Sequence, residues 1–294
     1  MTENSYYSID NIKIGYGNFN LPPILIGTLF YQGQTLIDRK KSSIFDSLKA
    51  KKRIDTQIEL SKQYKLPNLI EISANEPNSM PIYLEFFLKH YEPPFVLGGT
   101  YEARIEGLQY LQDNGVDPKY FIYNAISNLK NPNEVEALKK FKVQNVVVLI
   151  LGSNNMTATQ RFAYLTEKSQ PHDLSILDGL KELGVRNILI DGGVIDIESL
   201  AHILETQKII SESLKYPVGT APGLFLFKFS SPRLNLKFHT RYRRASIMAI
   251  ASFFSNFLFY GAIEDAKESF ASVYQARMFR NTLKDLNIKL FHSF

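Results

Sequence analysis

The sequence predicts an α/β protein of the (β/α)8 barrel type, and three observations support this fold class. Short apolar runs of strand-forming residues alternate with segments of helical spacing along the chain. Some runs, such as residues 145–151 (NVVVLIL), are uninterrupted, which is typical of parallel strands covered by helices on both faces. The length of 294 residues suits one barrel of about 250 residues with additions. A doubly wound open sheet is the alternative that the same alternation allows.

Eight buried strands are expected in order. They are residues 23–30, 68–73, 94–98, a strand within 119–128 (KYFIYNAISN), 145–151, 187–191, 216–220 and 257–261. The expected helices are residues 55–64, 78–90, 101–114, 133–141, 172–183, 197–214, one from 245 onward, and 265–286. Loops are expected at 152–171 and up to about 241. We find no domain boundary, so we expect residues 1–294 to form a single barrel domain with a short N-terminal extension, 1–20.

Local signals justify these elements. Pro77 and Pro81 stand where a helix begins, a position that tolerates proline, and Gly115 follows a helix as a C-terminal cap would. In the extension, alternation of Ile12 with Ile14 indicates a small strand or hairpin that caps one end of the barrel. Residues 245–263 carry no charge, but the run contains serines and changes from helical to strand character. We interpret it as a buried helix and a buried strand, with a membrane span as the alternative.

Composition narrows the chemistry. The chain has no cysteine, which excludes disulfides, thiolate zinc sites and a cysteine nucleophile, and its five histidines lack metal-ligand spacing. We therefore predict no metal site. The net charge of +5 is spread along the chain, and the runs 39–41 and 241–244 are expected to be solvated surface or a docking site for an acidic partner, not a nucleic-acid site. Residues 1–10 do not resemble a signal peptide, so we expect a cytoplasmic protein.

Polar residues at the carboxyl ends of the strands are the candidate site, because these ends meet at one mouth of a barrel. They are Thr28, Glu71, Asn124, Asn128, Ser153 to Asn155, Asp191, Thr220 and Glu264. These residues also have structural interpretations that need no ligand. Asn124 or Asp191 could belong to turns, and Glu71 could form an ion pair with a Lys or Arg. Glu264 could stand at a helix N-terminus, where the helix dipole favours an acid. Gly98 and Gly219 could admit a phosphate, but no P-loop, G-x-G-x-x-G or G-x-S-x-G motif is present.

Five segments in this order carry a family resemblance: PPILIGTLFY from Pro22, YNAIS from Tyr123, PNEVEALKKFKVQNVVVLI from Pro132, LID ending at Asp191, and LFYGAIEDAK from Leu258. Together they resemble the H subunit of tetrahydromethanopterin S-methyltransferase, a family similar to the pterin-binding (β/α)8 methyltransferases and dihydropteroate synthase. The resemblance extends over residues 23–276.

This resemblance implies an enzyme of one-carbon metabolism, related to methanogenesis. It would move a methyl group between N5 of a tetrahydropterin (tetrahydromethanopterin or tetrahydrofolate type) and the cobalt of a corrinoid. The chain has no D-x-H-x-x-G segment, so the corrinoid is expected on a partner protein. The resemblance also implies a homodimer without a transmembrane segment, peripheral to a membrane complex.

Site roles follow from the same resemblance. Asp191, Asn124 and Glu71 are the expected catalytic residues, and Asp191 would accept hydrogen bonds from the pterin N3–H and 2-amino group. Asn124 would contact the pterin nearby, and the expected binding set adds Asn128, Ser153, Thr220 and Glu264.

Two positions depart from the family pattern. Gly98 stands in place of an acid and Gly152 in place of an amide, which residues 153–155 could replace. Two alternatives therefore stay open: a non-catalytic barrel subunit of a methyltransferase assembly, and a barrel that acts on another one-carbon donor or a phosphorylated small molecule.

Overall fold

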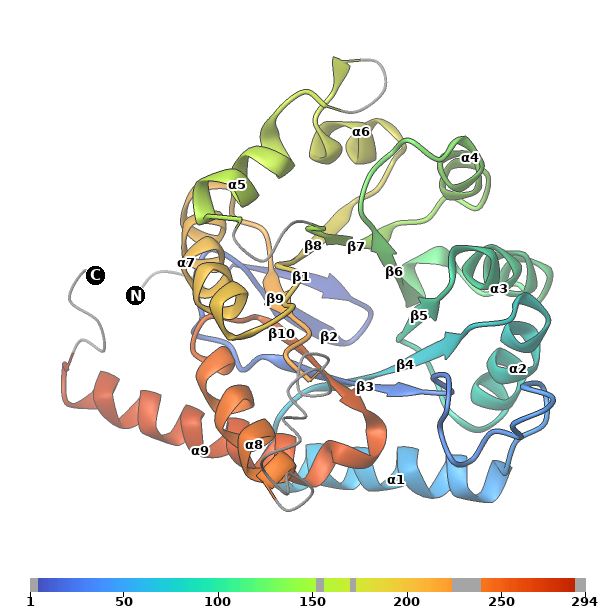
Figure 1. Ribbon diagram of the computed structural model, residues 1–294, viewed down its shortest axis with the longest axis horizontal. Coiled ribbons are helices and arrows are strands. Elements are labelled where there is room, and N and C mark those ends of the chain that lie inside the picture. Colours follow the sequence, from blue (N-terminus) through green and yellow to red (C-terminus); the bar gives the residue numbers. More distant parts are fainter. Residues whose placement is uncertain (1–4, 152–155, 170–172, 224–238, 289–294) are drawn as a thin grey trace, which may run out of the picture.

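The computed structural model describes residues 5–151, 156–169, 173–223 and 239–288. Its described strands include a closed barrel of eight parallel strands in the order β10-β3-β4-β5-β6-β7-β8-β9, surrounded by helices (Figure 1). The barrel strands are β3 (Ile24–Leu29), β4 (Asn68–Ala74), β5 (Phe95–Gly99), β6 (Phe121–Ile126), β7 (Asn145–Leu149), β8 (Asn187–Asp191), β9 (Val218–Thr220) and β10 (Phe257–Ala262). The barrel prediction is confirmed, and the open-sheet alternative is wrong because β10 pairs with both β3 and β9.

The helices are α1 (Ser47–Tyr64), α2 (Met80–His90), α3 (Tyr101–Asp113), α4 (Pro132–Lys140), α5 (Ala158–Thr166), α6 (Ile176–Glu182), α7 (Ile197–Ser213), α8 (His239–Ser252) and α9 (Ala266–Asp285). Short 3-10 turns η1 (Pro77–Ser79), η2 (Pro118–Tyr120) and η5 (Ile263–Asp265) precede α2, β6 and α9. Most predicted elements are confirmed within a few residues.

Three predictions of helix position were wrong. The expected loop 152–171 contains α5, which begins with a capping box between Thr157 and Gln160. The first crossover helix begins at Ser47, where Asp46 caps it, and not at residue 55. Helix α8 begins at His239, so it precedes the predicted start at 245.

The N-terminal hairpin β1 (Tyr6–Ile9) and β2 (Ile12–Gly15) caps the amino end of the barrel, as predicted. Ile9 and Ile14 are buried and join the apolar cluster inside the barrel. The uncharged run 245–263 divides into α8 and β10, whose buried residues pack with α9. None of the helices in the described ranges is long and apolar enough to cross a membrane.

The alternation of strand residues decides what faces the mouth. One layer inside the barrel consists of Ile26, Leu69, Val96, Ile122, Val147, Leu189 and Phe259. Because side chains two apart on a strand share a face, the next layer toward the carboxyl ends includes Thr28, Glu71, Gly98, Asn124, Leu149 and Asp191. An apolar layer therefore supports a polar layer directly above it.

Candidate functional site at the barrel mouth

Three polar side chains from three strands form a hydrogen-bonded group at the mouth. The Thr28 hydroxyl donates to Oε2 of Glu71 at 2.5 Å, and Nδ2 of Asn124 donates to Oε1 at 2.6 Å. The register pairs Thr28 directly with Glu71, while β5 separates Glu71 from Asn124. Two predicted catalytic residues, Glu71 and Asn124, are thus in contact, and the ion pairs recorded among the described residues do not include Glu71.

Gly98 makes this contact across β5 possible. A Cβ atom at Gly98 would lie 2.2 Å from Oε1 of Glu71, which is far inside van der Waals contact. The carboxylate therefore occupies the space that a side chain on β5 would take. Glycine at this position, which the sequence presents as the loss of an acid, lets the acid of the neighbouring strand reach the amide.

The environment of Glu71 disfavours its charged form. The residue is 7% exposed, and burial raises the pKa of its carboxyl above the ordinary value. The hydrogen bonds from Thr28 and Asn124 and the charge of Arg104 oppose this rise. The group therefore holds a proton at higher pH than a solvated glutamate does.

Asp191 ends β8 and is the second buried acid of the polar layer, with 4% exposure. Burial raises the pKa of its carboxyl from 3.8 to about 7, and the nearby charge of Glu71 adds to the rise. The Gly193 N–H donates to Oδ1 at 2.9 Å and opposes it. The Thr220 hydroxyl also favours the charged form, although it makes no regular hydrogen bond with any described residue.

Two buried arginines behind the mouth were not predicted from the sequence. Arg104 on α3 donates from Nη1 to the Gly99 carbonyl at 2.6 Å, and from Nη2 to Glu134 at 2.8 Å. Arg161 on α5, with 0% exposure, donates from Nη1 to the Gly192 carbonyl at 2.5 Å. Each arginine therefore holds a backbone carbonyl at the end of a barrel strand. Arginine is rarely buried in this way, so sequence pattern alone gives no signal for either residue.

The other predicted site residues lie apart from this layer. Asn128 is in the loop after β6, where its Oδ1 accepts the Lys130 N–H at 2.9 Å. Glu264 in η5 pairs with Arg53 at 3.0 Å and accepts from Gln34 at 3.0 Å, which ties η5 to α1 and the loop before it. Ligand roles for both stay predictions.

Thr220 is the last residue of β9 and is fully buried. It lies two residues after Val218, whose side chain packs on the helix-facing side of the barrel. Ser153, with Gly152, Asn154 and Asn155, lies outside the described residues. Gly219 packs against Phe257, since a Cβ there would lie 2.5 Å from the ring. A phosphate site at Gly98 or Gly219 stays a prediction.

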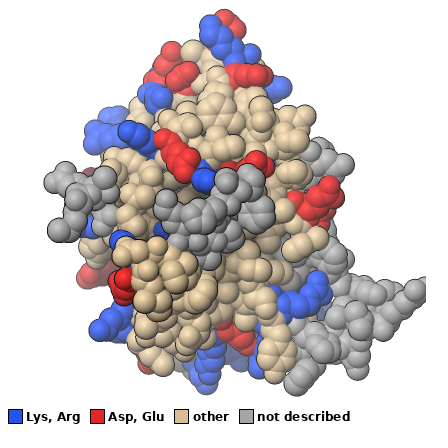
Figure 2. Space-filling model, turned by 90° about the vertical axis from the view of Figure 1, so that its left-hand side faces the viewer, with Lys and Arg blue, Asp and Glu red and all other residues tan. Residues whose placement is uncertain are grey.

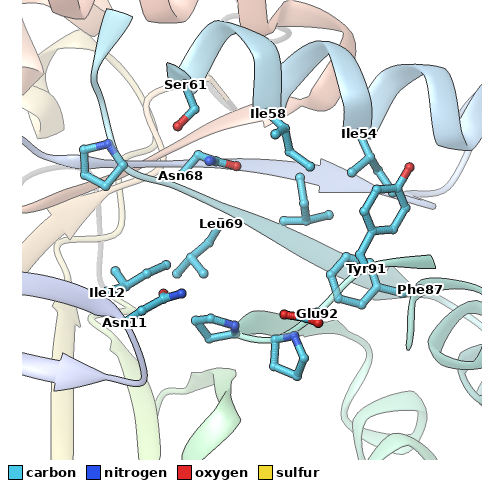
Figure 3. Close-up of a pocket in the computed structure, with 14 residues that line it drawn as sticks. Asn11, Ile12, Ile54, Ile58, Ser61, Asn68, Leu69, Phe87, Tyr91 and Glu92 are labelled. Atoms are coloured by element: carbon cyan, nitrogen blue, oxygen red, sulfur yellow. The ribbon is translucent and has the colours of Figure 1, made fainter. Parts of the chain in front are cut away.

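Pockets flank both ends of the barrel. One of about 520 Å³ lies beside the mouth, between the loops that follow β3 and β4, and its lining includes Gln34 and Asn75. Another of about 320 Å³ lies at the amino end, where Ile12 of the hairpin is opposite Phe87 and Tyr91 (Figure 3). The described residues that line this second pocket include one acid, Glu92, whereas the mouth holds Glu71 and Asp191, so we take the mouth as the candidate site.

Surface charge does not single out another site on the face in Figure 2. Lysines and arginines there are interspersed with acidic residues, and they do not form one basic stripe. Among the described residues, no group of three or more His, Asp or Glu is placed to hold a metal ion.

Comparisons with known proteins identify relatives of the chain by sequence and by fold. The family model described as "Tetrahydromethanopterin S-methyltransferase MtrH subunit" matches residues 2–290. The chain is 29% identical over 214 residues to the H subunit of tetrahydromethanopterin S-methyltransferase from Methanothermobacter marburgensis, covering 72% of this chain and 69% of the relative. It is 24% identical over 300 residues to the protein of the same name from Methanosarcina acetivorans, covering 98% and 94%.

A similar solved structure is the Yersinia pestis dihydropteroate synthase in complex with a sulfonamide drug. It has a TM-score of 0.61 and 12% identity, and the likeness covers 95% of this chain and all of that one. At this identity, the likeness concerns the fold.

Proposed function

The chain belongs to the family of the tetrahydromethanopterin S-methyltransferase MtrH subunit, and from this premise we propose that its barrel mouth binds a tetrahydropterin that carries a methyl group on N5. The methyl group would be exchanged with the cobalt of a corrinoid on a partner protein. The observation that carries the proposal is the position of Glu71, which reaches over Gly98 to Asn124 and gives the mouth two acids and an amide.

Asp191 suits recognition of the pterin ring. The N3–H and the 2-amino group of a pterin lie on one edge, and a carboxylate can accept both hydrogen bonds together. The Gly193 N–H holds Oδ1 of Asp191 and fixes the orientation of the carboxyl group. Two ligand donors would favour the ionised form and offset part of its desolvation, because hydrogen bonds to a carboxylate lower its pKa.

Asn124 suits contact with the reacting nitrogen. When the C–N bond breaks, its electron pair stays on N5, which is a poor leaving group unless a donor or a proton stabilises it. An amide nitrogen has two N–H donors, and Asn124 gives one of them to Glu71. The second makes no hydrogen bond recorded with a described residue and would be available for N5, and the Glu71 carboxyl would keep the amide in this orientation.

The corrinoid would supply a nucleophilic cobalt centre that takes the methyl group. We place it on a partner because this chain lacks a D-x-H-x-x-G segment. The partner's identity, the direction of transfer, the homodimer, the peripheral attachment to a membrane complex and the cytoplasmic location all stay predictions.

The test is calorimetric titration of the purified chain with methylated and unmethylated tetrahydropterins. We expect saturable binding to the wild type, and a loss of at least 10-fold in affinity for Asp191→Ala, since an unmade charged hydrogen bond costs about 1.5–3 kcal/mol. Asp113→Ala removes an exposed acid of α3 and should bind as the wild type does. Absence of heat from a folded wild-type chain would reject the pterin site and favour the non-catalytic alternative.

A further inference from the structure

Arg161 has a position that the proposed chemistry does not yet use. It is the largest of the fully buried side chains in the described part of the molecule, and it comes from α5, which packs against α6 and α7. Its Nε donates to the Met156 carbonyl at 3.1 Å and its Nη1 to the Gly192 carbonyl. Its Nη2 is buried and has no hydrogen-bond partner among the described residues.

The carbonyl that Arg161 holds belongs to the turn that orients Asp191. Residues 191–193 are fixed at four points. The Asp191 carbonyl accepts the Ile150 N–H at 2.9 Å, and the Gly192 N–H donates to the Gly219 carbonyl at 3.0 Å. The Gly192 carbonyl accepts from Arg161, and the Gly193 N–H donates to Asp191. Gly193 has φ +70°, and a Cβ there would lie 2.1 Å from the Ile150 carbonyl oxygen, so the turn has little freedom.

The two buried arginines differ in charge compensation. Arg104 forms an ion pair with Glu134 at 2.8 Å. Arg161 is absent from the ion pairs recorded in the described ranges, and the acids that act on its guanidinium are Asp191 and Asp196. Asp196 lies at the N-cap of α7, where its side chain accepts the Ser199 N–H. Asp191 of the mouth is thus one of the two acids that interact with the positive charge of Arg161.

We infer that Arg161 is a positioning residue for Asp191: it fixes the 191–193 turn through the Gly192 carbonyl and places a positive charge behind the carboxyl group. The charged groups that act on Asp191 are then Glu71 from β4, which disfavours ionisation, and Arg161 from α5, which favours it. For pterin binding, this inference rests on the proposed function. The inferred role predicts that Arg161 lowers the pH above which Asp191 is ready to accept the ligand's hydrogen bonds.

Two variants separate charge from packing. Arg161→Gln removes the charge and keeps an amide donor, whereas Arg161→Lys keeps the charge. Affinity for a methylated tetrahydropterin is measured by calorimetry between pH 5.5 and 9. In Arg161→Gln the pH midpoint for binding should rise by about one unit, the low end of the effect of a neighbouring charge, with ~5–10-fold weaker binding at pH 7. Arg161→Lys should keep the wild-type midpoint, as should Arg186→Gln, which changes an exposed arginine.

A ligand-free measurement keeps the inference testable if no pterin binds. The stabilities of chains with and without Asp191→Asn are compared across the same pH range, in the wild-type and Arg161→Gln backgrounds. The pH at which the Asp191 contribution changes should move upward by the same unit. A midpoint unchanged by Arg161→Gln in either measurement would overturn the inference, whereas absence of binding to the wild type, with the ligand-free shift intact, would reject only the pterin proposal.

Discussion

The Asp191→Asn substitution should stabilise the protein at alkaline pH. The folded-state pKa of Asp191 is about 7 and its ordinary value is 3.8, a difference of about 3 pH units. At about 1.4 kcal/mol per unit, ionising this buried carboxyl costs the folded state about 4 kcal/mol above pH 7. Asparagine has the same shape and can still accept the Gly193 N–H, but it carries no charge.

The sign follows from the direction of the shift. Between pH 3.8 and about 7 the folded state binds more protons at Asp191 than the unfolded state does, so the stability due to this group is present below pH 4 and is lost as the pH rises through about 7. The variant lacks this loss. It should therefore match the wild type near pH 4 and exceed it by up to about 4 kcal/mol at pH 8.

Urea denaturation followed by circular dichroism at pH 4.5, 6 and 8 measures this difference. Asp113→Asn, a change to an exposed acid, is the control and should stay within about 0.5 kcal/mol of the wild type at every pH. An Asp191→Asn chain that is equally or less stable than the wild type at pH 8 would refute the reasoning, because it would mean that the carboxyl is well compensated in its charged form.

Two further substitutions test the construction of the mouth and of the barrel. Gly98→Ala places a Cβ where the Glu71 carboxyl lies, so it should lower the free energy of unfolding by about 2 kcal/mol or more. The loss should be smaller when Glu71→Ala is also present. Additive losses in this double-mutant cycle would contradict the contact. Asn145→Ala removes a buried amide that donates to the Phe121 carbonyl at 2.9 Å and accepts from Asn187. We expect the free energy of unfolding to fall by about 1–3 kcal/mol. An unchanged free energy of unfolding would refute this role of Asn145.

The strands could be predicted because each must hide an apolar run on both faces. Residues 187–191 were predicted as a strand and are β8. Asp191 was correctly placed at the end of its strand, since a polar residue that ends such a run has only the mouth to face. Asn124 was expected after its strand, but it lies within β6, which continues to Ile126.

The rest depends on neighbours that the sequence does not identify. In the sequence, Gly98 was interpreted as the loss of an acid. The acid is supplied by Glu71 of the neighbouring strand, and its reach across β5 depends on strand register, which the sequence does not give. Helix α5 (ATQRFAYLT) has few strongly apolar residues, and its buried Arg161 contradicts the usual preference of arginine for the surface. Contacts between strands and the next layer of helices therefore set the limit of the prediction.

Methyl transfer itself is the most direct test of the central claim. The chain is mixed with a methylated tetrahydropterin and reduced free cobalamin, and the cobalamin absorbance is followed with time. We expect methylation of cobalt above the protein-free rate. Asn124→Ala should reduce it about 100- to 1,000-fold, because loss of one aimed donor costs about 2.7–4 kcal/mol of transition-state stabilisation. Tight pterin binding with no transfer above the protein-free rate would contradict the account and favour a non-catalytic role.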